Sequence, residues 1–562
     1  QMMNQEIQES ITDLGSGTLV KGKVIPLDIS GGLLWSDLEG YYDMNDDDAD
    51  DKSDNSRHGS PENITTVQSQ TAPLPYTTIR DGMWSDTSAA TPWTLGNSVW
   101  NAPNRIGVDG STPIDWNIVQ SSHNLTSGNN DITVLGLITN TASTKFTVAD
   151  PIDTQDETNS GQSLTVTHYL EMDGDIDLIG ESQLVQSEGS ILDQDSGGSL
   201  EQDQQGTASS YNYNYWTSSM NPTTPAGLGQ LGTGVASTNA NYTIARIVKD
   251  GTTSSTPETI NFQSSYAAAD GSATSPITIS SYWLWKFNGT DDDYNSWMSI
   301  DQNSSLIAGE GYTMKGSSGL ASITTPQNYV YKGKPNNGDI TLNVDLGDNR
   351  LIGNPYPSAI DADEFILDNI SDGSGRAATN IINGALYFWD HFAGASHNLG
   401  EYVGGYATYT LMGGVKAIAN DERINDNNAD GTKIPKQYIP VNQGFFVSAT
   451  LDTDTDDTTA TVTGGTIQFK NSQRVFKTET ADPSVMFRNS QNTTSNTQEN
   501  LDTRQKIRLR FDSPSGYHRQ LLVGADPNAT NNFDLGYDAP IIDINTEDMF
   551  WINNNNKFVI QA

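Results

Sequence analysis

The sequence predicts an all-β protein, built as a right-handed parallel β-helix-like solenoid followed by antiparallel β-sandwich domains. Three observations support this fold class. Apolar and polar residues alternate over short runs, Gly, Asn, Asp, Ser and Thr punctuate these runs, and helical periodicity is scarce. An apolar content of 35%, with 11 Trp, 22 Tyr and 15 Phe, is enough to fill several cores in 562 residues.

Residues 1–75 read as an acidic entry segment or linker, because the stretch DMNDDDADDKSDNSRHGSPEN at 43–63 has the composition of a solvated loop. Residues 76–205 then show near-regular rungs of about five residues, each ending in a polar turn. Stacked parallel strands explain this spacing at least as well as a sandwich, with Leu, Ile and Val stacked inward. The rungs are ITVLGLI (132–138), KFTV (145–148), LTVTHYLEM (164–172), IDLIG (176–180) and SQLVQ (182–186).

Two β-sandwich-like domains are expected next, over 206–350 and 351–562. Their strands are longer and rich in aromatic residues, as in antiparallel sheets. The runs are TISSYWLWKF (278–287), GALYFWDHF (384–392), GYATYTLM (405–412), GFFVSATL (444–451) and TIQFKN (466–471).

Near the end of the chain, KIRLRF at 506–511 alternates three apolar with three basic residues, which predicts a half-buried strand with Ile507, Leu509 and Phe511 on one face. The segment DSPSGYH supplies a turn and RQLLVGA a return strand. MFWI and KFVI flank NNNN as a second hairpin.

One short helix is predicted over 361–369. Asp361 and Glu364 have the spacing of a capping box, and Phe365 and Ile366 face inward. The preceding GNPYP predicts a rigid turn, because each Pro restricts its own φ and the residue before it.

Charge and composition exclude several classes of function. Seventy Asp and Glu against 29 Lys and Arg give a net charge of −41, which repels nucleic acid and anionic lipid. Cysteine is absent, so disulfides and thiolate zinc sites are excluded. No run of 18 apolar residues predicts a membrane span.

Several segments resemble, in order, a family of large surface proteins that flavobacteria (Bacteroidota) export by the type IX secretion system, many of them adhesins. The similarity covers about residues 80–562 and is carried best by LIGNPYPSAIDADEFILDN at 351–369, supported by LEQDQQGTASSYNYNYW (200–216), GYTMKGS (311–317), YVYKGKPNNG (329–338) and QGFFVSA (443–449). The resemblance implies an extracellular β-rich protein that meets the type IX machinery during export. It also implies a C-terminal sorting domain beyond KFVIQA, so we expect this chain to be a piece of a larger protein.

Calcium is the cofactor that the sequence favours. In DMNDDDADDKSD, oxygen-bearing side chains fall at positions 1, 3, 5, 9 and 12 of a 12-residue loop, a spacing that wraps ligands round one hard cation. The loop resembles those of thrombospondin type 3 repeats, although Asp48 replaces the expected Gly and no Glu stands at position 12. The alternative is an acidic linker. The predicted ligands are Asp43, Asn45, Asp47, Asp51 and Asp54.

A second candidate loop, DNNADGTKIPKQ at 426–437, opens with the D-x-N-x-D-G pattern of calcium loops. Its candidate ligands are Asp426, Asn428 and Asp430. Positions 9 and 12 are Ile434 and Gln437, so an ion there needs ligands from elsewhere in the fold, and an ordinary turn is the alternative. Asp173, Asp175 and Asp177 share one face of a strand and are expected to face water.

No catalytic residues are predicted, since the sequence has no G-x-S-x-G, no P-loop and no H-E-x-x-H. His391 and His397 lie close in sequence, and we interpret them as surface or sheet-edge histidines in preference to a zinc pair. In YNYNYW, Tyr211, Tyr213 and Tyr215 point to one face. An exposed tyrosine ladder there could stack on sugar rings, whereas packing between modules is the alternative.

The sequence therefore predicts a non-catalytic segment of an extracellular, cell-surface protein that acts as an adhesin or display module. Glycans or other surface proteins are its candidate partners. Two alternatives stay open: the accessory, carbohydrate-binding region of a secreted polysaccharide-degrading enzyme, and a subunit of an extracellular filament.

Overall fold

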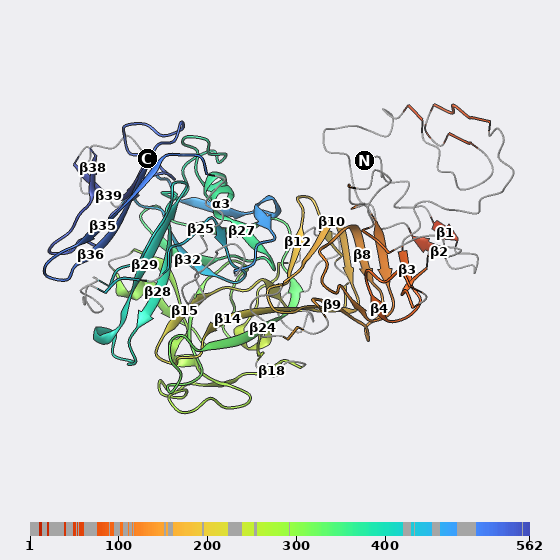
Figure 1. Cartoon of the computed structure of the whole chain (residues 1–562), viewed down its shortest axis with the longest axis horizontal. Coiled ribbons are helices and arrows are strands. Elements are labelled where there is room, and N and C mark those ends of the chain that lie inside the picture. Colours follow the sequence, from red (N-terminus) through yellow and green to blue (C-terminus); the bar gives the residue numbers. More distant parts are fainter. Residues whose placement is uncertain are drawn as a thin grey trace. The chain divides into compact units, whose positions relative to one another are not determined.

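The computed structural model describes residues 11–13, 19–21, 39–40, 49–51, 53, 55–60, 76–88, 90–94, 102–104, 111, 115, 117–150, 153–154, 161–193, 196–222, 239–251, 256–290, 293–419, 429–431, 433–451, 461–479, 502–553 and 555–562. The chain divides into two compact units. The N-terminal unit comprises 1–152, 162–177 and 184–199, and the C-terminal unit comprises 153–161, 178–183 and 200–562. Figure 1 colours the chain from its N-terminus to its C-terminus.

Parallel strand pairing dominates the N-terminal unit. Successive stretches of chain alternate between two ladders: β3, β6, β8, β10 and β13 pair in parallel in one, and β4, β7 and β9 in the other. The ladder through β3, β8 and β10 is visible in Figure 1. The strands of this part of the chain are β1 (Ile11–Asp13), β2 (Leu19–Lys21), β3 (Tyr76–Thr78), β4 (Gly82–Met83), β5 (Trp93–Thr94), β6 (Ile118–Ser121), β7 (Leu125–Thr126), β8 (Ile132–Thr139), β9 (Lys145–Val148), β10 (Ser163–Met172), β11 (Asp175–Leu178), β12 (Gln183–Gln186) and β13 (Ile191–Leu192).

An apolar column runs through this unit. Val119 pairs with Leu137, Leu137 with Leu170, and Leu170 with Leu192, so aliphatic side chains of four strands lie in register. All four are buried. The expected inward stacking of aliphatic residues is therefore present in this ladder.

The prediction that Asp173, Asp175 and Asp177 face water is wrong for Asp177, which is buried, whereas Asp173 and Asp175 are partly exposed. Asp173 accepts a hydrogen bond from the Gly197 amide (3.0 Å), and Asp175 accepts one from the Ser199 amide (2.8 Å). Asp177 is 4% exposed and pairs with Lys145 at 3.0 Å. Asp173 and Asp175 bind the neighbouring chain because a backbone N–H at a strand end otherwise lacks a partner.

In the C-terminal unit, antiparallel pairing prevails and helix is scarce, as the sequence predicts. Its largest sheet has the order β15-β23-β21-β26-β32-β28-β29-β30, with β22 paired to β21. Its strands are β15 (Tyr213–Trp216), β23 (Tyr312–Lys315), β21 (Trp285–Gly289), β22 (Trp297–Ser299), β26 (Asn349–Gly353), β32 (Gly444–Ser448), β28 (Leu386–Ala393), β29 (Val403–Thr410) and β30 (Gly413–Val415).

Strands of other sheets and short helices complete the unit. The remaining strands are β14 (Leu200–Thr207), β16 (Met220–Asn221), β17 (Val248–Asp250), β18 (Glu258–Thr259), β19 (Asn261–Gln263), β20 (Thr278–Ser280), β24 (Pro326–Pro335), β25 (Ile340–Val344), β27 (Ala359–Asp361), β31 (Tyr438–Ile439), β33 (Gly465–Phe469), β34 (Arg474–Val475), β35 (Lys506–Asp512), β36 (His518–Gly524), β37 (Ala539–Pro540), β38 (Trp551–Asn553) and β39 (Asn556–Gln561). The α-helices are α2 (Ile244–Ile247) and α3 (Ala362–Asn369), and the 3₁₀ turns are η2 (Ser281–Trp283), η3 (Tyr294–Ser296), η4 (Leu399–Glu401) and η5 (Asn471–Gln473).

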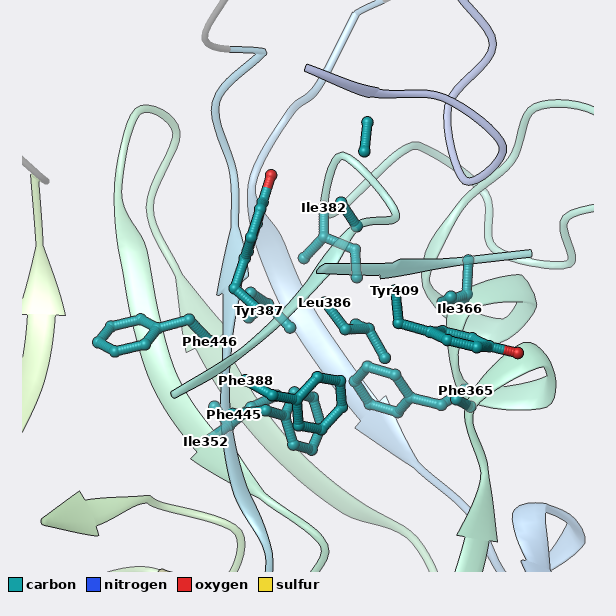
Figure 2. Close-up of a cluster of buried hydrophobic side chains, with 14 of the residues drawn as sticks. Ile352, Phe365, Ile366, Ile382, Leu386, Tyr387, Phe388, Tyr409, Phe445 and Phe446 are labelled. Atoms are coloured by element: carbon teal, nitrogen blue, oxygen red, sulfur yellow. The ribbon is translucent and has the colours of Figure 1, made fainter. Parts of the chain in front are cut away.

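Both faces of the largest sheet are buried. On one face, Phe365 of α3 packs edge-on against Phe445, with ring centroids 5.6 Å apart, and Phe388 lies beside it (Figure 2). On the other face, Phe446 contacts Phe287 at 5.1 Å. This alternation of neighbouring phenylalanines follows from the period of two along a strand.

The GNPYP turn is built around Asn354 and Tyr356, both fully buried. The Asn354 amide nitrogen donates to the carbonyl oxygens of Ser358, Ile439 and Pro440, at 2.8, 3.2 and 2.9 Å. The Tyr356 hydroxyl donates to the Gly338 carbonyl at 2.7 Å. The motif thus ties three segments of chain together by side-chain hydrogen bonds.

The helix after this turn is confirmed. Asp361 is its N-cap and accepts from the amides of Asp363 (2.9 Å) and Glu364 (3.4 Å). Phe365 and Ile366 are fully buried, as predicted.

The two C-terminal hairpins are also confirmed, as β35–β36 and β38–β39, but the face assignment of β35 is wrong. Ile507 is 59% exposed and Leu509 38% exposed. Lys506 donates instead to the Met412 carbonyl, and Arg508 to the Gly414 carbonyl at 2.6 Å. Long basic side chains can cover a sheet with their aliphatic stems while their charged ends bond to exposed carbonyls.

We predict that Asp361→Ala lowers the free energy of unfolding by about 1 to 2 kcal/mol, because two helix N–H groups lose their acceptor. Urea titration of both proteins measures this loss. Asp361→Asn keeps an acceptor at the same place and is expected to lose less. Equal losses for Ala and Asn would contradict the capping role.

Candidate functional site

Most of the predicted calcium ligands lie outside the described residues: Asp43, Asn45, Asp47, Asp54, Asp426 and Asn428. Asp51 is described and buried, and its carboxylate accepts from the amides of Ser53 (2.9 Å) and Arg57 (2.8 Å). These bonds close a turn. They leave calcium binding at this loop a prediction.

In the second loop, Asp430 pairs with Arg510 at 3.3 Å. The fully buried Asp390 of β28 lies beside this loop, because a Cβ placed on Gly431 would meet its carboxylate at 3.0 Å. Lys433 is 3.6 Å from Asp390. Asp430 and Asp390 thus each form an ion pair with a basic side chain.

The predicted exposed tyrosine ladder is not present. Tyr215 is 5% exposed and stacks on Trp389, with centroids 5.9 Å apart. Tyr213 lies in a T-shaped contact with Tyr402 at 6.0 Å. Aromatic side chains of the same unit cover these two residues, whereas the alternative interpretation of this segment was packing between modules.

The most unusual polar group among the described residues is Lys315, which is 2% exposed. It stands on β23 directly opposite Tyr213 of β15. Its ammonium nitrogen lies 3.7 Å from the centroid of the Trp283 ring, 4.6 Å from that of Tyr213 and 4.7 Å from that of Tyr402. Three ring faces thus surround one lysine, a geometry that favours a cation.

Hydrogen bonds link this lysine to two loops. Lys315 Nζ donates to the Tyr402 hydroxyl (2.6 Å) and to His397 Nδ1 (3.2 Å). His397 Nε2 lies 2.7 Å from the Asp270 carboxylate. With Nδ1 as acceptor, Nε2 carries the proton, so a continuous chain runs from Asp270 through His397 and Lys315 to Tyr402.

Burial lowers the pKa of Lys315 to about 7, although the Asp270 carboxylate opposes the shift. Burial also lowers the pKa of His397, against the effect of Asp270. The pKa of Tyr402 is raised by burial. The pKa of Lys315 therefore lies near neutral pH, where its ammonium group can lose a proton, while the Tyr402 hydroxyl stays protonated and neutral.

The interpretation of His391 and His397 as surface histidines is wrong for His391, which is buried and accepts a hydrogen bond from the Tyr213 amide at 3.2 Å. Burial lowers the pKa of His391 to about 3. Among the described residues, no group of three or more His, Asp or Glu side chains is arranged to hold a metal ion.

Exposed tyrosines lie over this buried cluster, and we call the set Tyr266, Tyr282, Trp283 and Tyr294 the tyrosine face. Tyr266 is 57% exposed, Tyr282 50% and Tyr294 73%. Ring contacts join Tyr266 to Tyr282 (6.3 Å), Tyr282 to Trp283 (4.7 Å), Trp283 to His397 (4.8 Å) and His397 back to Tyr266 (5.9 Å). A closed circuit of four rings results.

Backbone contacts hold the tyrosine face in place. The Trp283 indole donates to the Tyr266 carbonyl (2.8 Å), and the Trp285 indole donates to the Tyr282 carbonyl (3.0 Å). Thr313 of β23 donates its hydroxyl to the Trp283 carbonyl at 3.0 Å. These bonds hold the backbone that carries Tyr266, Tyr282 and Trp283 in place, as a preformed binding surface requires.

The two basic side chains of the cluster are shielded from solvent. Lys315 is almost fully covered by rings, so a substrate has no direct path to its nitrogen. His397 is also mostly covered, with 12% of its side chain exposed.

In the described part of the chain, no helix is long and apolar enough to cross a membrane.

No sequence motif indicates this cluster, because its residues are far apart along the chain. Lys315 and His397 are 82 positions apart, and Asp270 is 127 positions from His397. Only the alternation in GYTMKGS hints that Lys315 shares a strand with buried residues.

We predict that Lys315→Met removes a pH dependence of stability. The folded pKa lies below the ordinary value, so between pH 7 and 9.5 the unfolded chain keeps a proton that the folded protein has lost. The free energy of unfolding of the wild type therefore rises in this window, by up to about 1.4 kcal/mol per pH unit. Below pH 7 the contribution is constant.

Urea titrations of wild type and variant at pH 6, 7, 8, 9 and 9.5 measure the effect as a difference, in which other groups cancel. The difference, variant minus wild type, should fall as pH rises above 7. The half-exposed Lys436, changed to Met, is the control for losing a lysine charge. A difference that stays constant from pH 6 to 9.5 would show that Lys315 titrates as an ordinary lysine.

Comparison with known proteins gives a family for most of this region. A family model described as a domain of unknown function, DUF8693, matches residues 235–562 and so includes every residue of the tyrosine face, with Lys315, His397 and Tyr402. No curated protein matches the chain. No solved structure matches it. Since the model matches more than half of the 562 residues, the chain belongs to the DUF8693 family.

Proposed function

We propose that this chain is a non-catalytic segment of an extracellular surface protein, an adhesin or display module exported by the type IX secretion system. The observation that carries the proposal is the tyrosine face: exposed aromatic rings fixed over a buried polar cluster. Contiguous exposed aromatic groups on a folded domain mark contact surfaces. The acidic surface and the resemblance to exported flavobacterial proteins support the extracellular location.

We also propose that residues 76–205 form a right-handed β-helix. The support is the alternation of successive chain stretches between two parallel ladders, together with the apolar column through Val119, Leu137, Leu170 and Leu192. Such a solenoid is a rigid spacer, because each rung contacts mainly its neighbours. It suits a protein that holds a binding domain away from the cell.

Two other functions are compatible with the same features. The accessory region of a polysaccharide-degrading enzyme would use the tyrosine face to hold substrate near a catalytic module. A filament subunit would use strand edges for assembly. The surface-display experiment below distinguishes a filament subunit from the other two functions, because antibodies against a filament label thread-like structures outside the cell.

Calcium binding at 43–54 and 426–437 is part of the proposal and is supported by the spacing of oxygen-bearing side chains. Because an ion that binds the folded state stabilises it by mass action, excess chelator should lower the melting temperature, and added Ca²⁺ should restore it. Asp43→Ala with Asp47→Ala should abolish most of this response. A melting curve that is the same with chelator and with Ca²⁺ would remove calcium from the proposal.

Surface display is tested on cells of the source organism. Antibodies raised against the purified chain should label unpermeabilised cells, and disabling the type IX translocon should move the antigen into the cell interior. Antibodies against an abundant internal protein control for membrane integrity. Labelling that appears only after permeabilisation would overturn the proposal, whatever the chain binds.

A further inference from the structure

The tyrosine face combines ring surfaces with polar groups at short range. Three tyrosines and one tryptophan come from three segments: the loop after β19, η2 and η3. Beside them, the Asp270 carboxylate is 31% exposed at its side chain and accepts from His397 and from the Ser210 hydroxyl at 3.3 Å. A carboxylate has about four acceptor sites, so capacity remains for a ligand hydroxyl.

We propose that the tyrosine face binds neutral carbohydrate, with pyranose rings stacking on Tyr282 and Tyr266 and sugar hydroxyls bonding to Asp270. This inference rests on the proposed function and names the ligand of the same surface. A sugar ring carries an apolar C–H face and a rim of hydroxyl groups. Aromatic rings next to a carboxylate and phenol hydroxyls match both features.

The net charge of the protein favours neutral carbohydrates over anionic ones. The net charge of −41 repels sulfated and uronic acid polymers. Lys315, the cationic side chain of the buried cluster, is covered by rings and already bonded to Tyr402 and His397. Neutral hexose polymers therefore fit better than polyanions.

Rigidity supports binding by a small surface. The indoles of Trp283 and Trp285 are tied to backbone carbonyls of the residues that carry the exposed tyrosines. His397, stacked on Trp283 at an interplanar angle of 20°, is fixed by Asp270 and Lys315. A surface that is already ordered loses little conformational entropy when a ligand binds.

The test uses isothermal titration calorimetry of the whole chain with neutral gluco-, manno- and galacto-oligosaccharides of four to six units, and with sulfated galactan oligosaccharides as the anionic comparison. At least one neutral series should bind. Tyr282→Ala and Tyr266→Ala should each weaken that binding by about tenfold. Tyr282→Phe, which keeps the ring and loses only the hydroxyl, should weaken it less than Tyr282→Ala.

Ile552→Ala is the matched control, since Ile552 is 67% exposed on β38, which belongs to a sheet of other strands, with β35, β36, β37 and β39. It should leave binding unchanged. Circular dichroism melts should show that all variants fold. No binding of any neutral series, binding of the anionic series alone, or binding that Tyr282→Ala and Tyr266→Ala leave unchanged would overturn the inference. Surface labelling of cells would stand in each of those cases, so the two proposals fail separately.

Discussion

Buried side-chain amides hold this protein together where loops meet. The chain has no cysteine, so no covalent bond closes its many turns. Instead, Asn354 donates to three carbonyls from two segments, and Asn336 donates to the carbonyls of Ser218 and Pro355, both at 3.0 Å. Each such bond contributes about 1 kcal/mol net, but leaving one of these buried carbonyls unpaired costs more. Loop conformation and core packing are therefore coupled.

The same principle builds the candidate site. Its rings stand on short loops, which would be mobile if only their own backbones held them. Indole and hydroxyl donors bind loop carbonyls at Tyr266, Tyr282 and Trp283, while Lys315 joins the loop of His397 to the sheet. Burying a lysine costs stability, and the cost falls as pH rises above the folded pKa. Buried ionisable residues with shifted pKa values, such as Lys315, are found more often at functional sites than elsewhere.

Local patterns predicted the local structures well. The cap at Asp361, the inward Phe365 and Ile366, and the C-terminal hairpins depend on residues within a few positions of one another. The period of two also located several of the longer strands, and its short rungs correspond to the parallel ladders of the N-terminal unit.

What depends on distant partners could not be predicted. Ile507 faces solvent because Lys506 and Arg508 donate to the carbonyls of Met412 and Gly414, which lie 94 positions away in the sequence. Tyr213 and Tyr215 are covered by residues of β28, β29 and the loop between them, which the YNYNYW pattern does not reveal. The Lys315 cluster joins four segments with no common motif. In each case the deciding contact lies in another part of the fold.

The central claim is that the tyrosine face is the binding surface of a rigid β-rich module. Indole N–H resonances of ¹⁵N-labelled protein test it most directly, since the chain has 11 tryptophans at distinct places. On titration with the neutral oligosaccharide series, the Trp283 and Trp285 signals, assigned with Phe variants, should move, while those of Trp84 and Trp93 in the N-terminal unit stay fixed. Movement of Trp84 or Trp93 with Trp283 unchanged would place the binding surface elsewhere and contradict the claim.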